Sequence, residues 1–125
     1  MFDSTDLTQL PKPALYAELH GQLRGLIAGE SDSIANLANA AALIFHGLPG
    51  LNWAGFYLMR DGELVVGPFQ GRPACVRIAV GRGVCGTAVT ETRTQIVADV
   101  EAMVVRSETK VARKVLEAAT KLRVV

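Results

Sequence analysis

The chain of 125 residues has few of the side chains that build metal centres and structural disulfides. It contains two cysteines and two histidines, and their positions do not match the spacing of zinc ligands. In a cytosolic protein, which the sequence indicates below, two cysteines are more typical of free thiols or a catalytic pair than of a structural disulfide. We therefore expect no metal site.

Long apolar runs and a strong net charge are also absent. No run approaches the roughly 20 residues of a membrane-spanning helix. The first six residues lack the basic and then apolar order of a signal peptide. A net charge of +1 predicts no strong attraction to nucleic acid or to a membrane surface. The sequence predicts a cytoplasmic protein with neither kind of partner.

What the sequence does have is enough apolar material for one core, since half of its residues are hydrophobic. The charges are uneven: residues 1–103 hold 7 basic and 10 acidic side chains, and residues 104–125 hold 6 and 2. We therefore separate a domain over 13–101 from an atypical basic amphipathic tail over 102–125. The tail could be a solvated helix that packs on the sheet, a frameshifted or truncated end that never orders, or a helix that binds a partner.

The pattern of apolar residues predicts helices over 14–27 and 32–46, with Ser31 or Asp32 as the cap of the second. Strands are expected over 51–59, 63–69, 74–80 and 94–99, with a short helix after Val84. Asp61-Gly62 suits a type I′ hairpin turn, and Pro68 should end or bulge its strand. This order predicts an α+β fold, a mostly antiparallel sheet with helices packed on one face.

Both cysteines fall in one stretch, residues 73–88. Residues 74, 76, 78 and 80 alternate as the buried face of a strand, and Gly81-Arg82-Gly83 allows a sharp turn. Cys85 would then lie near a helix N-terminus, where unpaired N–H groups favour a thiolate. Cys75 and Cys85 could be redox thiols or small core residues, and could pair with each other only if the turn folds back.

Other candidate residues have plainer interpretations beside the functional ones. Trp53 and Tyr57 are four residues apart, so on a strand they share a face, where they could form core or line a pocket. His20 and His46 fit surface or capping positions better than ligand positions. The arginines at 72, 77 and 82 could form an anion site, but solvated charges are the simpler interpretation.

Several motifs, in order, resemble one known family. Residues 53–57 (Trp-Ala-Gly-Phe-Tyr), 67–71 (Gly-Pro-Phe-Gln-Gly), 74–78 (Ala-Cys-Val-Arg-Ile) and 81–88 (Gly-Arg-Gly-Val-Cys-Gly-Thr-Ala) closely resemble the free methionine-(R)-sulfoxide reductases. Residues 33–43 match the second helix of that family as well. These are single GAF-domain enzymes, so the resemblance implies a GAF-like fold over roughly residues 13–101.

The resemblance also implies a chemistry that protects against oxidation. Family members reduce the R epimer of free methionine sulfoxide, an oxidoreductase activity in which one thiol attacks the sulfoxide sulfur and a second closes a disulfide. A thioredoxin-type reductant resets the pair, and no metal or bound cofactor is needed. By position, Cys75 matches the resolving thiol and Cys85 the second thiol of the pattern. Trp53 and Tyr57 match aromatic residues near the substrate pocket.

The chain departs from the family pattern after Glu101. The family has a third, attacking cysteine, an acidic segment that holds the substrate amine, two closing strands and a last helix, and none of these motifs is found here. The C-terminal part of the usual fold is therefore missing or replaced. The alternative interpretation is a non-catalytic GAF-like module that binds a small ligand, and an uncovered sheet edge would favour a homodimer.

Overall fold

The computed structural model describes residues 7, 9–97 and 102–104 of the chain. Its elements follow one another as the sequence predicts up to residue 97, and a further strand over Ala102–Val104 was not predicted. The helices are α1 (Lys12–Ile27), α2 (Ser33–Gly47) and α3 (Gly83–Glu91). The strands are β1 (Trp53–Arg60), β2 (Glu63–Gly71), β3 (Arg77–Ala79), β4 (Gln95–Val97) and β5 (Ala102–Val104). The predicted tail over 102–125 lies outside the described residues, apart from β5.

A leucine cluster joins α1 to α2. Leucines four residues apart on α1 lie on one stripe and meet a leucine of α2. The buried members are Leu7, Leu15, Leu19 and Leu43. Of the two predicted caps, Ser31 and Asp32, the structure selects Asp32, whose carboxylate accepts a hydrogen bond from the Ala35 N–H at 2.8 Å. This bond satisfies one of the free donors at the start of α2 and fixes where the helix begins.

Strands β1 and β2 form a hairpin, with Asp61 and Gly62 both at positive φ (50° and 81°) as a type I′ turn requires. The predicted irregularity at Pro68 is also present. Gly55 pairs with Phe69 but Tyr57 pairs with Val66, so one residue of β1 faces two of β2. The proline is accommodated in this bulge because it has no N–H to donate to the ladder.

The stretch after β2 departs from its prediction. The strand expected over 74–80 is confined to Arg77–Ala79, which pairs antiparallel with Glu63–Val65. The expectation of a buried apolar face is wrong at Val76 and Val80, which are 61% and 43% exposed. Val76 and Val80 lie just outside the three-residue strand. The alternation of apolar residues in the sequence continues beyond the strand, but only residues within a paired strand are held with one face against the core.

The turn into α3 is built from close backbone contacts. Gly81 and Gly83 both have positive φ, 86° and 60°, and α3 begins directly at Gly83. Gly86 is buried and approaches β3 so closely that a Cβ there would lie 2.6 Å from the Ala79 carbonyl oxygen. The predicted sharp turn and the short helix after it are confirmed, and small residues let that helix begin close against β3.

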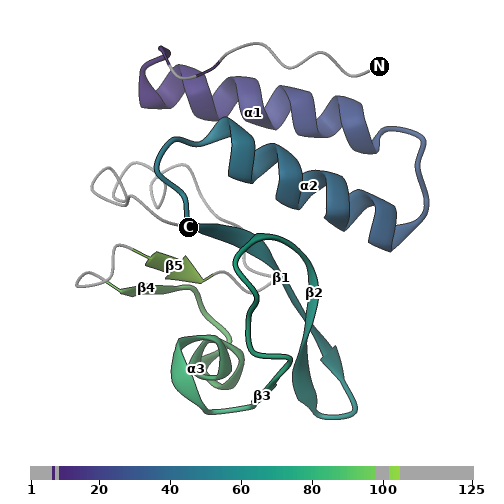
Figure 1. Ribbon diagram of the computed structural model, residues 1–125, viewed down its shortest axis with the longest axis vertical. Coiled ribbons are helices and arrows are strands. Elements are labelled where there is room, and N and C mark those ends of the chain that lie inside the picture. Colours follow the sequence, from purple (N-terminus) through teal and green to yellow (C-terminus); the bar gives the residue numbers. More distant parts are fainter. Residues whose placement is uncertain (1–6, 8, 98–101, 105–125) are drawn as a thin grey trace.

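The arrangement is layered, as Figure 1 shows. Helix α1 is outermost, α2 lies between it and the β1–β2 hairpin, and α3 and β3 lie at the end opposite α1, with β4 and β5 drawn between the levels of α2 and α3. Among the described residues every strand pair is antiparallel: β1-β2-β3 form one sheet and β4-β5 another. The predicted α+β class is confirmed.

Candidate functional site

The two cysteines lie on either side of the turn that leads into α3. Cys75 is exposed, in the irregular stretch between β2 and β3. Cys85 is half-buried, as the third residue of α3. Both thiols are free, so they do not form the disulfide that the sequence left open. One thiol is therefore open to solvent and to large reagents, and the other is partly enclosed.

The environment of Cys85 is less favourable to a thiolate than its position suggests. It lies in the first turn of α3, as predicted, but burial raises the pKa of its thiol, and a backbone hydrogen bond opposes that shift only in part. The expectation that the helix start would favour the thiolate is therefore wrong in its net effect. Removing the thiol from water outweighs the help from the free N–H groups.

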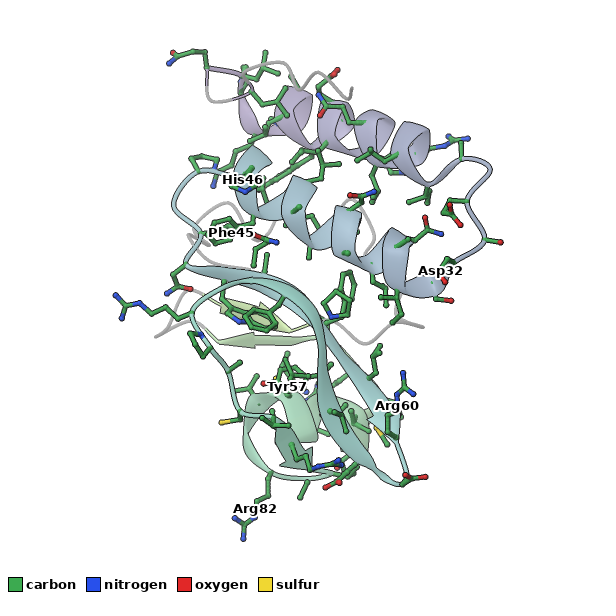
Figure 2. The ribbon with its side chains drawn as sticks, turned by 45° about the vertical axis from the view of Figure 1, so that its right-hand side comes forward. Asp32, Phe45, His46, Tyr57, Arg60 and Arg82 are labelled. Atoms are coloured by element: carbon green, nitrogen blue, oxygen red, sulfur yellow. The ribbon has the colours of Figure 1, made fainter. Side chains whose placement is uncertain are left out.

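The phenol of Tyr57 connects the hairpin to both thiols. Its hydroxyl donates a hydrogen bond of 2.7 Å to the main-chain carbonyl of Cys75, eighteen residues further along the chain. The pKa of the phenol is raised, mainly by burial and then by the charges that Cys85 and Cys75 carry when ionised. Both thiols therefore lie within electrostatic reach of this one hydroxyl. Figure 2 shows Tyr57 on the α3 side of the hairpin.

Three aromatic rings line up along the hairpin. The Trp53 indole is stacked on Tyr57, with centroids 6.1 Å apart and planes inclined by 25°. It is also stacked on Phe69, at 5.4 Å and 16°. The prediction that Trp53 and Tyr57 share a face is confirmed. The sequence interpretation missed Phe69, because only the register shift at the bulge places it opposite Gly55, between the two other rings.

An open pocket of about 450 Å³ adjoins the tryptophan. It is lined by Asn52, Trp53, Arg72 and Pro73, where the start of β1 meets the end of β2. The Trp53 indole N–H is buried and has no hydrogen-bond partner among the described residues. One aromatic residue, Trp53, and one basic residue, the exposed Arg72, therefore lie side by side at this pocket, a pair of residue types that suits a small molecule with a negative charge.

The remaining candidates follow the plainer interpretations. His20 and His46 are both exposed, and His46 lies edge-on to Phe45 at 5.3 Å. The Arg77 guanidinium is paired with the Glu63 carboxylate across β2 and β3. No cluster of metal-ligating side chains occurs in the described part of the chain. Within the same residues, no helix has the length and hydropathy needed to cross a membrane.

Comparison with known proteins relates this geometry to one group. No family model matches the chain. It is 54% identical to the free methionine-R-sulfoxide reductase of Escherichia coli K12 over 89 residues, which are 71% of this chain and 54% of the relative. The fold is similar to that of the free methionine-R-sulfoxide reductase of Neisseria meningitidis, solved in complex with its substrate, with a TM-score of 0.73 and 43% identity over 80% of this chain and 60% of the other.

A solved GAF domain is also similar, with a TM-score of 0.69 and 39% identity over 78% of this chain and 58% of that chain. These similarities confirm the GAF fold and the resemblance seen in the motifs. The chain spans a little over half the length of the reductase of Escherichia coli, 54% of it.

Proposed function

We propose that this chain, a GAF-fold protein similar to the free methionine-R-sulfoxide reductases over nearly three quarters of its length, reduces the R epimer of free methionine sulfoxide. Trp53 and Tyr57 would line the substrate pocket, and Cys75 and Cys85 would supply the two reducing thiols. The observation that carries the proposal is the position of Tyr57, which stacks on Trp53 and bonds the main chain of Cys75.

The proposed reaction needs two thiols and no resident metal or cofactor. One cysteine thiol attacks the sulfoxide sulfur and takes its oxygen, so methionine leaves and the cysteine becomes a sulfenic acid. The second thiol attacks the sulfenic sulfur, a sulfur–sulfur bond forms, and the oxygen leaves as water. The sulfoxide gains two electrons, and the two thiols lose them as they become a disulfide.

The pocket beside Trp53 fits a free amino acid. The methyl end of the substrate side chain would pack on the indole, where sulfur and methyl groups contact aromatic rings favourably. The Arg72 guanidinium would bind the free carboxylate. A methionine within a polypeptide has no such carboxylate, so this contact would favour the free amino acid.

The exposure of Cys75 suits the reductive half of the cycle. A disulfide that includes the exposed sulfur of Cys75 is open to attack by a thioredoxin-type dithiol. We propose such a dithiol protein as the partner and the cytoplasm as the place of the reaction. Homodimer formation through a sheet edge remains part of the same proposal. The raised pKa of Cys85 leaves less thiolate at neutral pH, so we expect a slow enzyme.

The test is turnover of separated R and S epimers of free methionine sulfoxide, with NADPH-coupled thioredoxin and with dithiothreitol. We expect consumption of the R epimer only. With thioredoxin as the reductant, Cys75→Ser and Cys85→Ser should each abolish multiple turnover, and without any added reductant the variant that retains the attacking thiol should still release one methionine per chain. Tyr16→Phe, on α1, is the control and should behave as wild type. No turnover of either epimer would contradict the proposal and favour a ligand-binding module without catalysis.

A further inference from the structure

The stretch that carries Cys75 is held by two consecutive carbonyl groups. Residues 72–76 lie between β2 and β3 and belong to neither strand. The Val76 carbonyl accepts a hydrogen bond from the Val66 N–H at 2.9 Å, and the Cys75 carbonyl accepts one from the Tyr57 hydroxyl at 2.7 Å. Two neighbouring peptide groups are thus fastened to the hairpin, one through the backbone and one through a side chain.

The two donors are themselves partners. Tyr57 and Val66 face each other directly in the register of β1 and β2, next to the bulge, which precedes Tyr57 in β1 and follows Val66 in β2. The two hydrogen bonds therefore come from one position along the hairpin, and they hold the main chain of Cys75 and Val76 against it. We call these four residues the Cys75 clamp.

We propose that Tyr57 is a positioning residue for Cys75, whose hydroxyl fixes the main chain of this cysteine and so determines where its thiol lies. The inference rests on the proposed function, because it assigns Tyr57 a task in the thiol chemistry and not only a place in the substrate pocket. A thiol that must meet a second sulfur gains rate from being held in place. The hydrogen bond supplies that restraint without touching the substrate.

The electrostatics keep the clamp closed while the thiols ionise. Burial and the charges of both thiolates raise the pKa of the Tyr57 phenol, so it retains its proton when either cysteine is deprotonated. A phenol that keeps its proton continues to donate to the Cys75 carbonyl. The restraint is therefore present in the state in which the thiols react.

The test is Tyr57→Phe, which removes the hydroxyl and leaves the ring that stacks on Trp53. Tyr16→Phe, the other tyrosine of the chain, is the matched control. We expect kcat to fall about 3- to 10-fold, the effect of one lost neutral hydrogen bond, with KM unchanged. If KM rises while kcat stays constant, the Tyr57 hydroxyl acts only through substrate binding, and the positioning role is wrong.

A second readout does not need activity. A Cys85→Ser background leaves Cys75 as the single thiol of the chain, which can carry a nitroxide spin label. We expect the label to move faster, with a narrower spectrum, when Tyr57→Phe is added, and to be unaffected by Tyr16→Phe. Unchanged label motion would overturn the proposal. Absence of turnover by the wild-type protein would refute the proposed function. In that case the motion of the spin label at Cys75 would still test whether Tyr57 restrains this cysteine.

Discussion

Gly55 lies directly opposite Phe69 across the β1–β2 hairpin, and the phenylalanine occupies the space that a side chain at position 55 would need. A Cβ on Gly55 would be 2.3 Å from the Phe69 Cβ and 2.7 Å from its Cα. These distances are far below van der Waals contact. The stack of Phe69 on Trp53 therefore depends on the missing side chain of this glycine.

Replacing Gly55 with alanine should destabilise the fold. The added methyl group meets backbone as well as side chain, so the hairpin must shift, and overpacking of this kind costs about 1–3 kcal/mol. Urea unfolding followed by Trp53 fluorescence would measure the loss. Gly21→Ala, on α1 where nothing lies within 4 Å, is the control and should add about 0.5–1 kcal/mol of stability. Equal stability of Gly55→Ala and wild type would contradict this packing.

Replacing Arg72 with glutamine should weaken substrate binding and leave the chemical step alone. If the guanidinium holds the carboxylate of the free amino acid, its loss removes a charge-assisted hydrogen bond, and KM should rise about 10-fold or more with kcat unchanged. Steady-state kinetics on the R epimer would measure this. Arg60→Gln, an exposed arginine at the end of β1, should have no effect. A drop in kcat at constant KM would exclude the assigned role.

The reactivity of Cys85 should have an unusually alkaline pH dependence. Burial raises the pKa of its thiol, so at neutral pH less of it is thiolate than in the unfolded chain. In Cys75→Ser protein, the rate of alkylation by iodoacetamide should rise with pH to a midpoint above that of an ordinary thiol. In denaturing urea the midpoint should fall back. If the midpoint is lower in the folded protein than in urea, the free N–H groups at the start of α3 stabilise the thiolate more than burial destabilises it, and the prediction is wrong.

Removing the cap of α2 should also be measurable. Asp32→Ala takes away the acceptor for the Ala35 N–H and should cost about 1 kcal/mol. Asp32→Asn keeps a capping oxygen and should cost much less. Thermal unfolding of the two variants would compare them, and identical melting temperatures would rule out a stabilising cap.

Local rules of the sequence were sufficient for much of the fold. Asp61-Gly62 specifies its turn because both residues accept positive φ, and Pro68 produces a bulge because it cannot donate to the ladder. Side-chain chemistry narrowed the cap of α2 to Ser31 or Asp32, and the structure shows that it is Asp32. In each case one residue and its neighbours in the sequence contain the whole physical reason.

Features that depend on distant parts of the chain could not be predicted in the same way. The exposure of Val76 and Val80 follows from where β3 ends, which alternation does not reveal. Position in a helix predicted a thiolate at Cys85, but burial by the rest of the fold reverses the sign. The bond from Tyr57 to the Cys75 carbonyl joins residues that no sequence pattern connects.

The two-residue turn between β1 and β2 also has a consequence for the order of folding. Trp53 and Phe69 belong to one hairpin closed by this turn, and hairpins form in about 1–10 μs. The α1–α2 leucine core requires contacts from a longer stretch of chain, beginning at Leu7. We therefore expect fluorescence of Trp53, the single tryptophan, to change before that core is complete. The aromatic stack beside the pocket would then be among the earliest parts of the molecule to assemble.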